Sequence, residues 1–278
     1  MLTARRHFAE CVKEARNHGL VGVLLSNLSM LGLTEIYCGD TAVGRASVRE
    51  GLEIARRVGD LRSELIALLS LTSGLNIQGQ FDELRTYAEQ ALRLSKQLGA
   101  RRFHAECLAI IANSMLSSED RAAGLQLAEE GLQMSREIGM SYCGPAILGV
   151  LARLTNDRAQ RAEALAEGET LLAGGCVSHS YFEFYYHAIE VSIEQNAWSA
   201  ARRYANDLAS YTEDEPLPST DLQIDRARLL ADVGENVITP RTRAALQALR
   251  ERCREMNAVA AIPAIDAALE FLERAPTA

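Results

Sequence analysis

A forty-residue repeat is the feature that most restricts what this chain can fold into. Four segments of similar sequence begin at positions 9, 49, 89 and 129. One column of the repeat is apolar in every copy and a second column is always glycine: Val12, Leu52, Leu92 and Leu132, then Gly19, Gly59, Gly99 and Gly139. A fixed period of this length is typical of repeat arrays, in which each unit packs only on its neighbours.

Each copy predicts the second helix of a helical hairpin. Apolar residues recur at helical spacing, as at Leu52, Ala55 and Val58, and the segment ends at a glycine suited to a helix C-cap. Upstream, repeated leucines predict the first helix, and a column of small or short residues would let the two helices approach closely: Leu28, Leu68, Leu108 and Leu148, then Gly32, Thr72, Ala112 and Ala152. Turn signals at 38–40, 78–82 and 117–120 separate the two helices.

The second hairpin carries the sequence on which a family resemblance rests. Its residues are Leu71-Thr72, Leu75, Gly79-Gln80-Phe81-Asp82, Leu84, Ala88 and Ala91. This order resembles a tetratricopeptide repeat, although the period exceeds the family's usual length of about 34 residues, so we expect longer helices. The resemblance implies an all-α, right-handed superhelical solenoid of antiparallel helix pairs.

We expect one elongated domain over 1–278, because a solenoid grows by stacking and needs no second core. Its predicted parts are 1–19, an unpaired second helix or N-terminal cap; 20–173, four regular hairpins; 174–256, two irregular hairpins; and 257–278, a capping helix and tail. Phe8 and Val12 lie where an upstream repeat would cover them, which favours a chain cut from a larger polypeptide over a natural cap. The apolar surface left on 1–19 predicts a homodimer through an end of the solenoid.

The C-terminal half carries a second, narrower resemblance. The segments 171–179 (LLAGGCVSH), 198–205 (WSAARRYA) and 211–219 (YTEDEPLPS) resemble the C-terminal repeat region of bacterial signalling proteins. Those proteins join a class III nucleotide cyclase domain to an AAA-like (STAND-type) ATPase, and the resemblance implies a tail that binds a partner or regulates the upstream domains. The sequence has no GxxxxGK[ST] phosphate loop and no paired cyclase aspartates, so we expect neither activity from it.

Charge and cysteine usage limit the partners and the cofactors. A net charge of −8 argues against nucleic acid, whose phosphates need a basic surface. The six cysteines form no CxxC pair, and neither a signal peptide nor an apolar run of membrane-spanning length occurs, so we expect a cytoplasmic protein with no membrane contact. Cys176 and His179 have C-x-x-H spacing but lack nearby further ligands, so we expect no metal and no cofactor.

Two groups of residues are candidates for chemistry at the register break after Leu172. Five aromatic side chains lie within 181–186, followed by His187, and they suit either a ligand pocket or a core that fills the space where the repeat register shifts. Ser178 and His179 are adjacent, but adjacency in sequence does not make a catalytic triad. We therefore expect no enzymatic activity and no catalytic residue.

The concave face is the remaining place for function, because first helices line it in tetratricopeptide arrays. The candidate partner-binding residues are Ser29, Tyr37, Ser73, Asn76, Glu106, Asn113, Arg153, Asn156, Glu183, Tyr186, Glu190 and Arg228. Asn76 and Asn156 take equivalent places two repeats apart, and paired amides could hold an extended peptide backbone. A hydrated groove without a dedicated ligand is the alternative.

Two functional hypotheses follow from different classes. The first is a non-enzymatic protein-protein interaction module, the regulatory or scaffolding tail of a bacterial signalling protein, which binds a peptide, a protein segment or its own upstream domains. The second is a small-molecule sensor with a ligand pocket near the aromatic helix 181–187. A hydrolase on a helical scaffold is a third class, for which the sequence offers no positioned groups.

Overall fold

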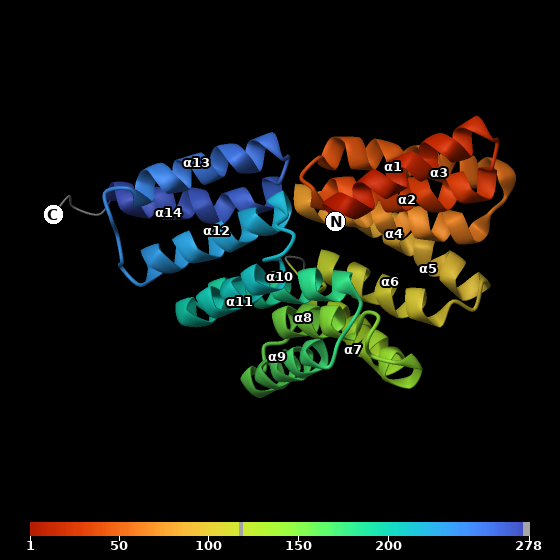
Figure 1. The fold of residues 1–278 in the computed structure, drawn as a ribbon. Coiled ribbons are helices and arrows are strands. Elements are labelled where there is room, and N and C mark those ends of the chain that lie inside the picture. Colours follow the sequence, from red (N-terminus) through yellow and green to blue (C-terminus); the bar gives the residue numbers. More distant parts are fainter. Residues whose placement is uncertain (117–118, 275–278) are drawn as a thin grey trace.

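The computed structural model of the protein describes residues 1–116 and 119–274. These residues form fourteen α-helices and one short 3-10 helix with no strand among them, so the predicted all-α fold is confirmed (Figure 1). The elements are α1 (Leu2–Asn17), α2 (Val21–Tyr37), α3 (Thr41–Val58), α4 (Leu61–Gln78), α5 (Phe81–Gln97), α6 (Arg101–Ser114), α7 (Arg121–Ile138), α8 (Gly144–Leu154), α9 (Arg158–Ala173), α10 (Ser178–Glu194), α11 (Trp198–Tyr211), α12 (Pro218–Gly234), α13 (Thr242–Glu255), η1 (Val259–Ala261) and α14 (Ile262–Arg274). No helix in this described part of the chain is long and apolar enough to cross a membrane.

The repeated glycines end helices, as predicted. α3 ends at Val58, and Gly59 then takes a left-handed conformation with φ of 72°. The equivalent glycine after α1, α5 and α7 also has a positive φ. A side chain with a Cβ is strained in this region, which explains the glycine at each of these helix ends.

Two glycines allow the helices of the first hairpin to touch. A Cβ built at Gly32 of α2 would lie 2.5 Å from the carbonyl oxygen of Gly44 on α3 and would also overlap Val48. Gly44 faces the carbonyl oxygen of Gly32 in the same way. The predicted role of the small-residue column is confirmed at this crossing.

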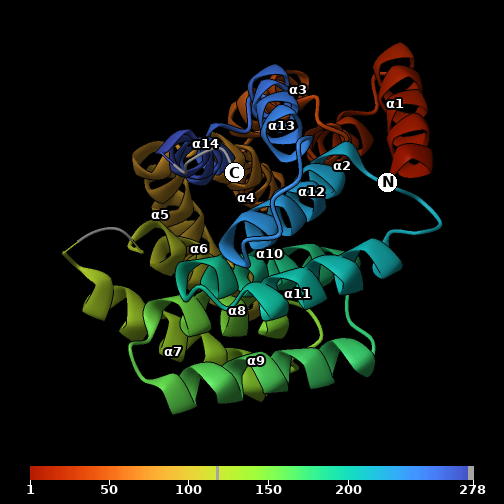
Figure 2. The same ribbon diagram turned by 90° about the vertical axis from the view of Figure 1, so that its left-hand side faces the viewer.

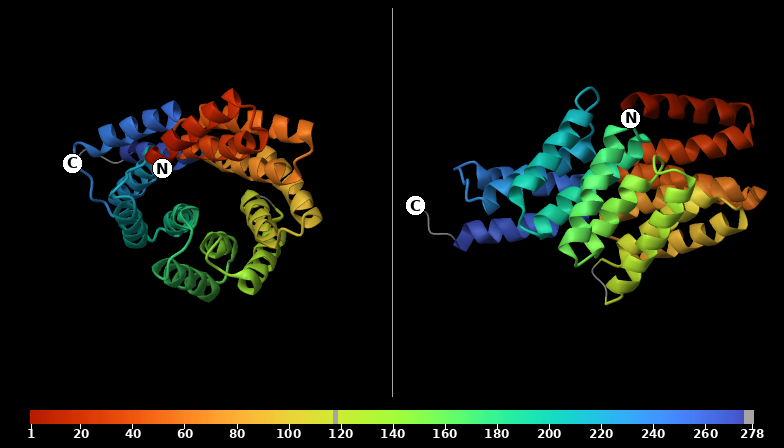
Figure 3. Two further views of the ribbon diagram at one scale, coloured as in Figure 1. Left: turned by 45° about the vertical axis from the view of Figure 1, so that its right-hand side comes forward. Right: turned by 90° about the horizontal axis from the view of Figure 1, so that it is seen from below.

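The helix pairs wind into a right-handed superhelix whose two ends meet. The first helix of each pair lies on the inside and the second on the outside, so that the inner helices surround a common centre (Figure 3). Two hydrogen bonds join the C-terminal half to the N-terminal half. The Ser219 hydroxyl donates to the carbonyl oxygen of Tyr37 at 2.5 Å, and the Thr41 hydroxyl donates to the carbonyl oxygen of Met256 at 3.2 Å. α12 therefore lies against α2 (Figure 2). The array is a closed ring and not the elongated, open stack that nearest-neighbour packing alone predicts.

The first helix packs on its own chain. Val12 is buried against Leu28 and Leu31 of α2, with Phe8 beside it. The Arg5 guanidinium pairs with Asp40 at 2.7 Å. Val12 of α1 thus has an inner partner in α2, and the upstream neighbour expected from the sequence stays a prediction.

The division of the chain into a cap, regular hairpins and irregular hairpins stays a prediction. Part of the predicted turn 117–120 and the last four residues of the predicted tail, 275–278, lie outside the described residues. Pro145 occupies the first turn of α8, where its missing N–H costs no helical hydrogen bond.

Candidate binding site

A cavity of about 150 Å³ lies at the centre of the ring, and we call it the chamber. All six inner helices and η1 contribute to its wall: Tyr37 (α2), Asn76 (α4), Glu106 and Asn113 (α6), Ile147 (α8), Glu183 (α10), Arg226 (α12) and Ala260 (η1). A second cavity of about 440 Å³, which we call the outer cavity, shares five wall residues with the chamber: Asn76, Asn113, Tyr186, Glu190 and Ala260. It continues past Arg153 to Glu194, whose side chain is 41% exposed.

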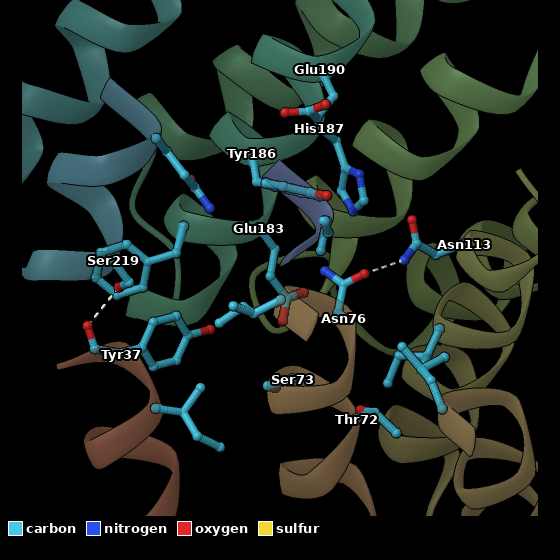
Figure 4. Close-up of a pocket in the computed structure, with 18 of the residues that line it drawn as sticks. Tyr37, Thr72, Ser73, Asn76, Asn113, Glu183, Tyr186, His187, Glu190 and Ser219 are labelled. Atoms are coloured by element: carbon cyan, nitrogen blue, oxygen red, sulfur yellow. Dashed lines mark hydrogen bonds between the residues drawn. The ribbon is translucent and has the colours of Figure 1, made fainter. Parts of the chain in front are cut away.

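Two asparagines from neighbouring inner helices form a hydrogen-bonded pair in the wall. The Asn113 Nδ2 donates to Asn76 Oδ1 at 3.0 Å (Figure 4). Asn113 is 7% exposed, and its Oδ1 has no hydrogen-bond partner among the residues that the structure describes. The Asn76 Nδ2 likewise makes no hydrogen bond to a described residue. The pair therefore presents free N–H donors together with one unpaired carbonyl oxygen, and such groups complement the C=O and N–H of a peptide group.

Two carboxyl groups, Glu106 and Glu183, face the chamber. The Tyr142 hydroxyl donates to Glu106 Oε2 at 3.0 Å, whereas no described residue donates to Glu183. Burial raises the pKa of Glu106 to about 7. Burial, with the Glu106 charge adding to it, raises the pKa of Glu183 to about 8. Both groups thus lose their protons near neutral pH, and Figure 4 shows the Glu183 side chain reaching into the space that Asn76 and Tyr37 also enter.

Tyr37 and His187 add neutral polar atoms to the wall. The Tyr37 ring lies 5.1 Å from that of Phe182, centroid to centroid, and burial raises its pKa, so the hydroxyl stays protonated. His187 is 5% exposed, and burial lowers the pKa of its imidazole well below the ordinary value, so the ring is neutral. Its Nδ1 has no partner within the described chain.

The arginines at the two cavities have carboxylate partners of their own. The Arg226 side chain is 6% exposed, pairs with Glu190, and donates through Nε to the carbonyl oxygen of Ala261 at 3.1 Å. Arg153 pairs with Glu194 at 2.5 Å and lies 5.8 Å above the ring of Tyr186. Arg226 also ties α10 and α12 to η1, which supports the closure of the ring. Neither arginine pairs with Glu106 or Glu183.

The aromatic helix α10 serves both the core and the chamber. Tyr181 stacks on Tyr211 at 4.1 Å, and Phe184 is fully buried beneath α9 and α11. Phe182 and Tyr186 line the chamber instead. The two interpretations that the sequence left open therefore apply to different faces of one helix.

The structure brings together nine of the twelve residues predicted from the sequence. Eight line the chamber and Arg153 lines the outer cavity; the eight are Tyr37, Ser73, Asn76, Glu106, Asn113, Glu183, Tyr186 and Glu190. That any of them binds a partner stays a prediction.

The other three predicted residues lie away from both cavities. Ser29 is 1% exposed and is enclosed between α2 and α3 beside Gly51. Asn156 is exposed in the loop after α8, because that helix ends at Leu154, and it is therefore not the structural equivalent of Asn76. Arg228 turns outward and donates to Asn206 at 2.8 Å.

Sequence reasoning missed Arg226 and Tyr142, and it named His187 beside the aromatic cluster without selecting it as a site residue. Arg226 could have been found, because it stands at helical spacing between the buried Leu222 and Leu230. A charged residue on such an apolar face must have a partner inside the protein.

Cys176 and His179 do not form a metal site. The Cys176 thiol donates to the carbonyl oxygen of Leu171 at 3.3 Å. Across the described residues, no group of three or more His, Cys, Asp and Glu side chains is placed to hold a metal ion.

Comparison with known proteins identifies the class of fold. No protein-family model matches the sequence, and no curated protein matches it either. Among solved structures, the chain is similar to the crystal structure of a Rap protein complexed with competence and sporulation factor, with a TM-score of 0.64 and 11% sequence identity. The match covers 98% of this chain and 85% of the Rap protein. This is a tetratricopeptide-like helical-repeat protein over nearly its whole length.

Proposed function

We propose that this chain is a non-enzymatic binding module that holds a peptide, or a segment of a partner protein, in the chamber and the outer cavity. The observation that carries the proposal is the Asn76–Asn113 pair, whose free N–H donors and unpaired carbonyl oxygen complement the C=O and N–H of a peptide group. The outer cavity begins at the same two asparagines, so a chain bound there has room to continue toward the surface.

The structural comparison supports the same class of function. The Rap protein of similar fold is complexed with competence and sporulation factor. We extend this partner-binding role to the present chain and propose that it acts as the regulatory or scaffolding tail of a bacterial signalling protein. Its ligand is then either a separate protein or peptide, or a segment of the protein's own upstream domains.

A synthetic library of random hexapeptides tests the proposal. We expect the wild-type protein to select a subset of peptides, and the Asn76→Ala/Asn113→Ala variant to lose them. Gln126→Ala is the matched control, since it removes an exposed amide from the outer helix α7. A protein that selects no peptide above the background of the double variant would contradict the proposal.

A small-molecule sensor is the second candidate, and one observation favours it. The chamber is small and adjoins the aromatic helix, whose Phe182, Glu183 and Tyr186 line it. A metabolite panel screened by thermal shift tests this candidate, because a ligand at 100 times its dissociation constant adds about 2.7 kcal/mol. Stabilisation by a metabolite that is lost in Tyr186→Ala, together with an empty peptide selection, would favour the sensor over the peptide-binding module.

A further inference from the structure

We infer that the chamber recognises a cationic group of its ligand, an ammonium or a guanidinium, between Glu106 and Glu183. This inference rests on the proposed binding function and names the chemistry of the group that enters deepest. It is carried by the two carboxyl groups, by unpaired polar atoms in the same wall, and by the lack of an ion pair between either carboxyl group and a described residue. Burial raises the pKa of Glu106 and the Arg102 charge lowers it, but Arg102 forms no ion pair with this carboxyl group.

The carboxyl groups come from opposite parts of the repeat array. Glu106 lies on α6 and Glu183 on α10, more than seventy residues apart in the chain, and ring closure brings them to one cavity. Only Glu106 receives a hydrogen bond from a described residue, through Tyr142. Both side chains are partly buried, and a partly buried carboxylate without a partner is costly, so a cation between the two groups would recover part of that cost.

Unpaired buried polar atoms elsewhere in the chamber wall point to the same chemistry. Asn113 Oδ1 and His187 Nδ1 each lack a partner in the described chain, and both side chains are more than nine-tenths buried in the chamber wall. An ammonium or a guanidinium carries several N–H donors and no acceptor, so it can fill such sites together with the carboxylates.

The chamber suits an organic cation better than a metal ion. Ile110, Ile147 and Val150 line it alongside the carboxyl groups, and an apolar wall can cover the methylene stem of a lysine or arginine side chain. A calcium ion prefers about six to eight oxygen ligands, more than two glutamates supply. Peptides and free polyamine-type metabolites both carry suitable cations, and the experiment must separate these sources.

Proton release on binding can be measured on the wild-type protein, so it tests the cation site without any variant. The other titratable or charged groups around the carboxyl pair include Tyr37, Arg102, Cys107, Tyr142, Cys143, Tyr186, His187, Glu190 and Arg226. Burial raises the pKa of both thiols, so they stay neutral. The tyrosines and the histidine are neutral near pH 7, and Arg226 is paired with Glu190, so Glu106 and Glu183 are the groups that titrate there. A bound cation lowers the pKa of both carboxyl groups, and binding near neutral pH must release protons.

Matched pairs of probes test the inference by isothermal titration calorimetry. The first pair is acetyl-Ala-Ala-Arg-Ala-Ala-amide and the same peptide with citrulline, which replaces the guanidinium by a neutral urea group. The second pair is tetra-alanine amide with a free or an acetylated amino terminus, and agmatine serves as a free small cation. Each probe is titrated into wild type, Glu106→Gln/Glu183→Gln, and the surface control Glu213→Gln, in two buffers of different ionisation enthalpy.

We expect at least one cationic peptide to bind about tenfold more tightly than its neutral twin and to release protons on binding. The preference should disappear in the double variant and persist in Glu213→Gln. Equal binding of the twins, binding without proton release, or no binding by any cationic probe at millimolar concentration would overturn the inference. Neutral peptides that bind as tightly as their cationic twins, and depend on Asn76 and Asn113, would overturn the cation site alone, whereas binding of agmatine without any peptide would support it and contradict the peptide-binding proposal.

Discussion

Replacing Glu183 by glutamine should stabilise the protein at high pH and have little effect at low pH. The pKa of Glu183 is raised from 4.5 to about 8 in the folded chain. A group with a raised folded pKa contributes stability that is fully present below its unfolded value and is lost as pH rises through the folded value. The wild type should therefore lose stability between about pH 4.5 and pH 8 as this carboxyl ionises in the chamber.

The size of the effect follows from the same pKa difference. At about 1.4 kcal/mol for each factor of ten, the full difference corresponds to roughly 5 kcal/mol at about pH 9. Water entering the chamber screens the charge, so we expect about 2 kcal/mol in favour of Glu183→Gln. At about pH 5 the folded wild type is protonated at this site while its unfolded chain is already mostly ionised, so the two proteins should differ by less than about 1 kcal/mol.

Urea unfolding followed by circular dichroism, at about pH 5 and pH 9, measures both differences. Glu213→Gln is the control, because Glu213 is exposed and makes no side-chain hydrogen bond to a described residue. The reasoning is refuted if Glu183→Gln gains no stability at the higher pH, or if the surface control gains as much.

Three further predictions concern packing, closure and association. Gly32→Ala should cost about 1–3 kcal/mol of unfolding free energy in urea, because its methyl group meets α3, whereas Gly22→Ala on the same helix has open space and should gain about 0.5–1 kcal/mol. Arg226→Met should cost about 3–5 kcal/mol and speed amide exchange in α12 and η1, because it leaves Glu190 unpaired; Arg228→Met, on the exposed side, should change stability by less than about 0.5 kcal/mol. For the predicted homodimer, light scattering should give twice the chain mass and Val23→Glu, at a residue 46% exposed near the N-terminal end, should halve it; a wild-type monomer at every concentration contradicts this prediction.

The sequence predicted the repeats well because each repeat is a local structure. Helix ends, the close contact at Gly32 and the inner position of Asn76 and Asn113 all follow from residues within one or two repeats. The forty-residue register also placed Tyr37, Glu106 and Glu183 on inner helices. Local patterns of this kind are set by helical periodicity and by the conformation of single residues.

Ring closure could not be predicted in the same way. It depends on small rotations between repeats that add up along the array, and on contacts such as that between Tyr37 and Ser219, which are 182 residues apart. Asn156 is missing from the inner face because α8 stops early, at Leu154. The sequence analysis selected Arg228, whereas Arg226 lines the chamber. The repeat register shifts in this part of the chain, and a change of two positions along a helix rotates a side chain by about 200°.

Photo-crosslinking tests the central claim, that the ring encloses a binding site, most directly. Benzoylphenylalanine is placed at Tyr186, which lines both cavities, or at Tyr87 on the outer helix α5, which lines neither. A hexapeptide selected from the library is then added under ultraviolet light, and adducts are located by mass spectrometry. The account predicts a peptide adduct from position 186 and none from position 87; an adduct from position 87 alone would contradict it.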